Sequence, residues 1–90
     1  MFIHIDPKPS TEMFNMLEKY RICLSSPPDR DNLVAEIFFE GCQWAEINQE
    51  HSVFEIEFYP RPDVRPWKVG FSSAINALNE AKSMLTSTRN

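Results

Sequence analysis

Glutamates recur through the middle of the chain at spacings that could do acid–base, metal-binding or recognition chemistry. Six glutamates and no Lys or Arg lie between residues 36 and 57. Paired carboxylates serve as general acid and base where a pocket drives their pKa values apart, and they also attract Lys and Arg from a binding partner. Glu55 and Glu57 are two residues apart, so a strand would present both carboxylates on one face.

Catalysis and metal binding need companion groups, and the sequence does not supply them. His4 and His51 stand far apart and belong to no HxH or HxxxH spacing, while Cys23 and Cys42 form no CxxC pair. With two glycines in the chain, no glycine-rich phosphate loop or nucleophile elbow can be built. We therefore expect no catalytic residue, no metal site and no cofactor, and a small enzyme built on a sheet glutamate ranks last.

Three segments with a two-residue period must position these glutamates. Residues 33–40, 43–48 and 53–59 alternate between two side-chain sets, which predicts three β-strands. Glu40-Gly41 predicts a tight hairpin turn because glycine tolerates a positive φ, and the polar residues 48–52 predict the next turn. The three strands should form an antiparallel meander.

One face of this meander is predicted to be core and the other to be functional. The core face carries the apolar residues Leu33, Ala35, Ile37, Phe39, Ala45, Ile47, Phe54, Ile56 and Phe58. The opposite face carries Val34 and the candidate partner-binding residues Glu36, Phe38, Trp44, Glu46, Glu55, Glu57 and Tyr59. Aromatic anchors among carboxylates suit a partner rich in Lys and Arg, since like charges facing each other across strands are otherwise unfavourable. A solvated face with aromatic cross-strand packing remains the alternative.

Further elements complete a predicted α+β fold in the order β-α-β-β-β-α. Residues 2–5 predict a short strand, residues 11–21 a helix, and residues 25–29 a loop. Ser72 or Ser73 should cap a final helix with an apolar stripe. The expected architecture is an antiparallel sheet, a three-stranded meander that short edge strands could extend, with one or two helices on one face. Whether the first helix covers the functional face is left open.

A proline-rich loop should follow the meander. Pro60 to Pro66 cannot lie inside a sheet and predicts a stiff connection, after which Trp67 anchors a short extended piece. Arg61, Arg65 and Lys68 could bind an anion or extend an interface. Pairing with nearby carboxylates such as Asp63 is the favoured interpretation.

Length and composition limit the function classes. The 90 residues form one expected domain, 1–90, with 42% hydrophobic and 24% charged residues and a net charge of −4. The acidic charge disfavours direct nucleic-acid binding and favours a basic protein partner. No apolar stretch is long enough to cross a membrane and no signal peptide is visible, so we expect a cytoplasmic monomer or weak homodimer with reduced cysteines.

Several short segments resemble small bacterial immunity proteins, the kind encoded beside polymorphic or contact-dependent growth inhibition toxins. The resemblance lies in Ala35–Gly41, Glu55–Pro60, the Pro66-Trp67 step and the closing helix, and spans about residues 33 to 86. It implies an acidic, cytoplasmic protein that neutralises a toxin domain, frequently a basic nuclease, by stoichiometric binding. It carries over no individual residue. A self-associating regulatory module without catalytic activity is the alternative function.

Overall fold

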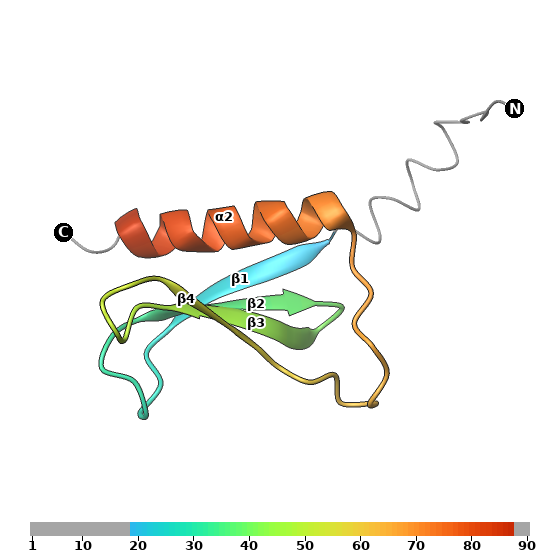
Figure 1. Cartoon of the computed structure of the whole chain (residues 1–90), viewed down its shortest axis with the longest axis horizontal. Coiled ribbons are helices and arrows are strands. Elements are labelled where there is room, and N and C mark those ends of the chain that lie inside the picture. The colour runs from blue at the N-terminus through green and yellow to red at the C-terminus, as the bar shows by residue number, and fades with distance from the viewer. Residues whose placement is uncertain (1–18, 88–90) are drawn as a thin grey trace, which may run out of the picture.

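The computed structural model describes residues 19–87, which form a four-stranded antiparallel sheet and one helix (Figure 1). The strands β1 (Tyr20–Ser25), β2 (Val34–Phe39), β3 (Cys42–Asn48) and β4 (Glu55–Phe58) lie side by side in chain order. Helix α2 (Phe71–Ser87) lies over one face of the sheet. The predicted α+β class, the meander of three strands and the C-terminal helix are therefore confirmed.

Strand β1 was not predicted, and it replaces the end of a predicted helix. The predicted strand 2–5 and residues 11–18 of the predicted helix lie outside the described residues, but Tyr20 and Arg21 belong to β1, so the helix boundary at residue 21 is wrong. Tyr20, Ile22 and Leu24 pack against the core beneath α2. Period-two alternation over six residues, stabilised by pairing with β2, overrides the helical spacing that precedes it.

Helix α2 packs on the sheet through small side chains. Ala77, Ala81 and Leu85 are buried, and the two alanines let the helix approach the strands closely. The helix begins at Phe71, so Ser72 and Ser73 lie inside its first turn rather than at its cap, and the prediction for the cap is wrong. On the sheet side the buried core residues are Ala35, Ile37, Phe39, Trp44, Ala45 and Ile47.

The hairpin between β2 and β3 confirms the predicted turn and adds a bulge. Glu40 and Gly41 both adopt positive φ, 55° and 78°, as a two-residue hairpin turn requires. The register then shifts: Ile37 pairs with Ala45 but Phe38 pairs with Gln43, so Trp44 is an extra residue on β3. A bulge of this kind changes the direction of the side chains beside it.

The bulge places Trp44 on the opposite side from its predicted position. Trp44 is 7% exposed and lies in the core together with its chain neighbour Ala45. Its ring meets Phe39 edge-on at 5.0 Å between centroids, and Phe58 at 5.5 Å. The prediction of Trp44 on the functional face assumed unbroken alternation, and is wrong.

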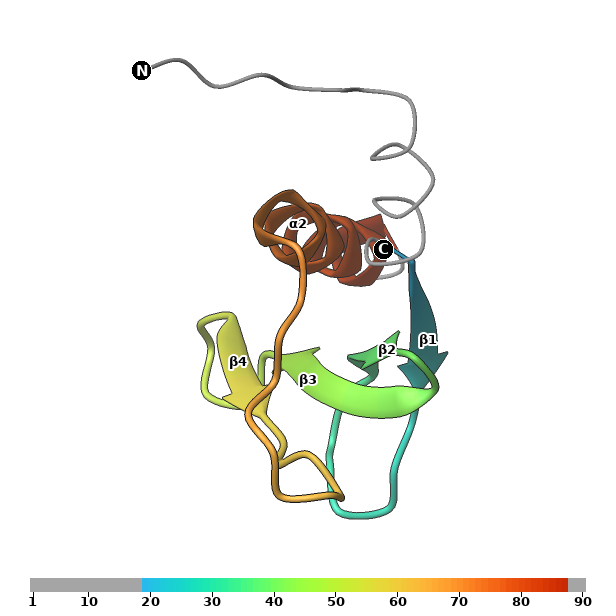
Figure 2. The same ribbon diagram turned by 90° about the vertical axis from the view of Figure 1, so that its right-hand side faces the viewer.

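Strand β4 forms one edge of the sheet, where the helix does not cover it (Figure 2). Among the described elements α2 contacts β1, β2 and β3 but not β4. The predicted core residues Ile56 and Phe58 are paired with Ile47 and Ala45 on the helix side, yet both are exposed. A helix about 10 Å wide cannot cover four strands spaced about 4.8 Å apart, so one edge is left open.

Candidate functional site

The buried carboxylate of Glu46 is the centre of a hydrogen-bond network on the face away from α2. Glu46 is 3% exposed. Its Oε2 accepts hydrogen bonds from Arg30 Nε at 3.1 Å and Asn48 Nδ2 at 3.0 Å, and its Oε1 accepts one from the Tyr59 hydroxyl at 2.9 Å. Both oxygens are satisfied, as a buried charged group requires.

Arg30 supplies the compensating positive charge from the loop between β1 and β2. Its Nη2 lies 2.9 Å from Glu46 Oε2 and 2.5 Å from Glu57 Oε1. Desolvation alone would lower the pKa of Arg30, but the two carboxylates more than offset it and raise the pKa above its ordinary value. One guanidinium therefore pairs with two of the four glutamates that the sequence assigned to partner binding, and it offsets only one of their two charges.

Glu50 fixes the same loop to the sheet. Its two carboxylate oxygens accept hydrogen bonds from the backbone N–H groups of Asp31 and Asn32, each at 3.1 Å. The Asp31 hydrogen bond is the main cause that lowers the pKa of Glu50 below its ordinary value, with Asn32 and Arg30 assisting against desolvation. The loop thus covers part of the predicted functional face, where Val34 is fully buried.

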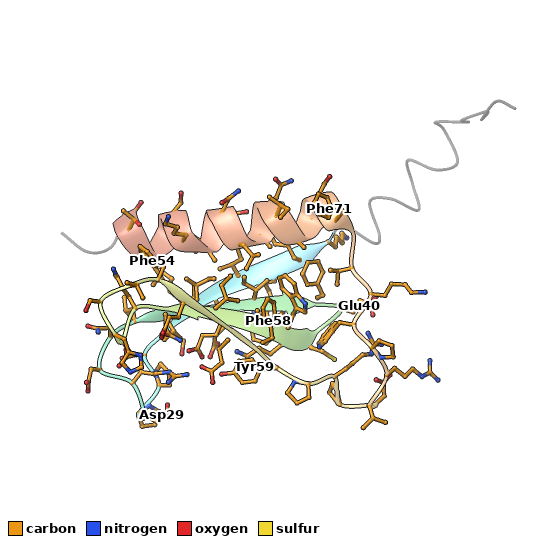
Figure 3. All side chains as sticks on the ribbon, in the orientation of Figure 1. Asp29, Glu40, Phe54, Phe58, Tyr59 and Phe71 are labelled. Atoms are coloured by element: carbon orange, nitrogen blue, oxygen red, sulfur yellow. The ribbon has the colours of Figure 1, made fainter. Side chains whose placement is uncertain are left out.

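Tyr59 contributes to the same network and not to a free surface. Desolvation and then the hydrogen bond to Glu46 raise its pKa to about 12. Its backbone carbonyl accepts a hydrogen bond from Trp67 Nε1 at 2.9 Å, which ties the segment after the proline loop to the sheet. Figure 3 shows Tyr59 on the face away from α2 and Phe58 on the helix side.

The other candidate residues remain accessible in part. Phe38 is half-buried, with the Arg21 guanidinium 4.3 Å from its ring centroid. Glu36 is half-buried between its cross-strand neighbours Cys23 and Glu46. Glu55 is exposed, 3.1 Å from His51 Nδ1.

The predicted functional face is therefore divided into an internal part and an outer part. Glu46 and Tyr59 belong to the internal polar network, and Trp44 belongs to the core. The accessible remainder is Glu36, Phe38, Glu55 and Glu57.

The carboxylate of Asp63 stabilises the conformation of the proline loop. Asp63 Oδ1 accepts hydrogen bonds from Arg61 Nε at 2.9 Å and from the backbone N–H of Arg65 at 3.1 Å, and these contacts, the Arg65 bond foremost, lower the pKa of Asp63. The expected pairing of Arg61 with Asp63 is confirmed. Val64, at the turn, is 93% exposed and adopts a φ of 55°, which is strained for a β-branched residue.

Large apolar side chains that the sequence did not predict to be exposed occur on β4 and on the side of α2 that faces β4. We name as the β4–α2 surface the exposed residues Ile56, Phe58, Phe71 and Ile75. Phe58 is 60% and Phe71 82% exposed. Phe71 and Ile75 share a helical stripe with Lys82, whose Nζ lies 5.2 Å from the ring centroid of Phe54, just before β4.

That contact shows which side of α2 lies beside β4. The sequence-based prediction missed this exposure because it assigned Ile56 and Phe58 to the core and made no assignment for Phe71. The available signal was the width of the sheet, which one helix cannot cover.

Two classes of site are not formed by the described residues. Across residues 19–87, no three His, Cys, Asp or Glu side chains are grouped so that they could hold a metal ion. No helix in that range is long and apolar enough to cross a membrane.

Comparisons of the chain with protein-family models, with curated proteins and with solved structures found no match in any of the three.

Proposed function

We propose that the protein is a non-catalytic binding module, an inhibitor or immunity protein that neutralises a bacterial toxin domain by forming a stoichiometric complex. One observation carries the proposal: the β4–α2 surface exposes Phe58 and Ile56 beside the accessible carboxylates of Glu55 and Glu57. Ile56 and Phe58 are neighbours on one face of the open edge strand. Neighbouring exposed apolar side chains mark interaction sites, and aromatic side chains supply much of the affinity of an interface.

The charge beside this surface indicates the kind of partner. Glu55 and Glu57 alternate with Ile56 and Phe58 along β4, the open edge strand, and the chain carries a net charge of −4. Carboxylates on the open edge strand accelerate the encounter with a basic protein and suppress acidic competitors. A basic toxin domain such as a nuclease is the proposed partner.

A co-expression experiment tests the proposal. We expect the gene directly upstream to encode the toxin domain. Its product is produced together with this protein, and the complex is analysed by size-exclusion chromatography with light scattering and by rescue of growth. We expect a 1:1 complex, which Phe58→Ser weakens by about 10- to 100-fold. Val53→Ser is the matched control, since Val53 is also exposed but lies outside the β4–α2 surface.

Two outcomes would contradict the proposal. The first is that the neighbouring gene product forms no complex with the protein. The second is that Phe58→Ser binds as tightly as Val53→Ser, because the β4–α2 surface would then take no part in binding.

A self-associating module is the second candidate, and the open edge of β4 is the observation that favours it. Exposed strand edges are templates for pairing with another copy. This function predicts a dimer whose population grows with concentration, measured by light scattering at two protein concentrations. A mass equal to that of the monomer at both protein concentrations would contradict the self-association function.

A further inference from the structure

Strand β4 retains the features of an edge that can accept another strand. It pairs with β3 alone, and all four of its residues, Glu-Ile-Glu-Phe, are exposed. Natural sheets protect their edges by keeping the edge strand short, and with charged side chains, Pro or a bulge. Between Glu55 and Phe58 there is no Pro, no Lys and no bulge, and the protection consists of the short length of β4 and its two glutamates. Two carboxylates repel an acidic strand but not a basic one.

The backbone groups of β4 divide into an inner and an outer set. The Tyr59 N–H donates to the Trp44 carbonyl at 2.9 Å, so Tyr59 bonds toward β3. In an antiparallel ladder the bonded residues alternate, which directs the N–H and C=O groups of Glu57 and Glu55 toward β3. The same alternation directs those of Ile56 and Phe58 outward, where an added strand would bond.

The side chains of β4 present a different chemistry on each face. Ile56 and Phe58 lie on the α2 side and belong to the β4–α2 surface, whereas Glu55 and Glu57 lie on the other side. A strand added beside β4 would therefore place apolar side chains next to Ile56 and Phe58. Its alternate side chains would lie next to the two carboxylates, and would best be basic.

A second copy of β4 fits this edge poorly. In an antiparallel pair related by a two-fold axis, facing residues share a sheet face. Either register that centres on β4 then sets Glu57 against Glu57 of the other copy, or Glu55 against Glu57. Facing carboxylates destabilise strand pairing, so the charges favour a different, basic strand over self-association.

We propose that an extended segment of the partner, with Lys or Arg alternating with apolar residues, adds to β4 as a fifth strand. This inference rests on the proposed binding function and specifies its mode. Backbone hydrogen bonds to the outward groups of Ile56 and Phe58 supply the pairing, and the two-sided pattern of β4 selects the sequence.

A peptide and a proline substitution test the strand addition. The probe is the capped peptide Lys-Val-Lys-Val-Lys-Val, titrated into the full chain by NMR. We expect shifts concentrated on β4 and slower hydrogen exchange at the amides of Ile56 and Phe58. Ile56→Pro removes an outward N–H that β3 does not use, and an edge strand tolerates proline at such a position. It should weaken binding at least about 10-fold more than Ile56→Ala, which removes only the side chain.

Two further peptides keep the test independent of the folding of the proline variant. A peptide N-methylated on alternate residues loses the backbone donors of one edge, and Glu-Val-Glu-Val-Glu-Val reverses the charge. Both should bind at least about 10-fold more weakly than the Lys-Val peptide. Equal binding of the N-methylated peptide, or no protection of the Ile56 and Phe58 amides, overturns strand addition.

Binding of the toxin domain by the variants distinguishes a failure of strand addition from a failure of the proposed binding function. If Ile56→Pro and Ile56→Ala bind that domain equally while Phe58→Ser weakens it, the partner uses side chains alone. Strand addition is then overturned and the binding function stands. If the Lys-Val peptide adds to β4 but no toxin domain binds, the edge chemistry is supported and the proposed function fails.

Discussion

Glu46 accepts hydrogen bonds from three residues, Arg30, Asn48 and Tyr59, in a position that water barely reaches. Glu46→Gln removes the charge that pairs with Arg30 while keeping the size of the side chain. Because Glu57 still compensates Arg30, we expect a loss of about 2 kcal/mol in the free energy of unfolding, less than for a buried pair with no second partner. Urea denaturation measures it.

Glu55→Gln is the matched control for this substitution. Glu55 is exposed on the same face, and an exposed ion pair contributes little, so its free energy of unfolding should change by less than about 0.5 kcal/mol. Equal effects of the two substitutions would show that the Glu46 network does not stabilise the fold.

Tyr59 makes the stability depend on alkaline pH. Its pKa rises from 10.0 to about 12 on folding, so the native state holds the proton more tightly than the unfolded state. The stabilisation is complete below pH 10.0 and is lost as the pH rises through about 12. We expect the native protein to lose stability between about pH 10 and 12 more steeply than Tyr59→Phe does, measured by urea denaturation at both ends of that range. Parallel curves for the two proteins would contradict the role of this phenol.

At the scale of elements, the alternation and the turn chemistry were sufficient to predict β2, β3 and the hairpin between them. Gly41 and the two-residue period act locally, so the sequence contains them directly. The bulge at Trp44 accompanies the packing of its ring against Phe39 and Phe58, two contacts between residues apart in sequence, and no local pattern contains them. The candidate site was therefore misassigned where a long-range packing choice overrode the period.

The charge network was unpredictable for a related reason. Arg30 lies 16 residues before Glu46 and 27 before Glu57, in a loop whose course the sequence leaves undefined. Only the folded loop brings its guanidinium onto the glutamate-rich face. The sequence does place the six glutamates correctly in strands and turns, but it does not show that the Arg30 guanidinium pairs with two of them.

Fluorescence quenching tests the bulge. Trp67→Phe leaves Trp44 as the only tryptophan, and Trp44→Phe leaves Trp67. Because Trp44 is packed between Phe39 and Phe58 and Trp67 is only half-buried, acrylamide should quench Trp44 at least about threefold less efficiently. Faster quenching of Trp44 than of Trp67 would contradict the burial of Trp44 and would indicate that Trp44 lies on the face away from α2.

The whole molecule separates charges that hold the fold from charges available to a partner. Arg30 and Glu46 form a largely buried pair, and such pairs are screened weakly by salt. Glu55 and the outer side of Glu57 lie at the open edge of the sheet, beside the β4–α2 surface. Salt should therefore act on binding and on folding to different extents.

Raising the NaCl concentration from about 50 mM to about 500 mM should weaken the complex with a basic partner by at least about 10-fold while the midpoint of urea denaturation changes little. Glu55→Gln should reduce the salt dependence of binding, since it removes an edge charge that the fold does not need. Val53→Ser, which changes no charge, should leave that dependence unaltered. A complex that resists salt as well as the fold does would mean that the partner binds through the apolar side chains alone, and that the carboxylates of β4 do not select it.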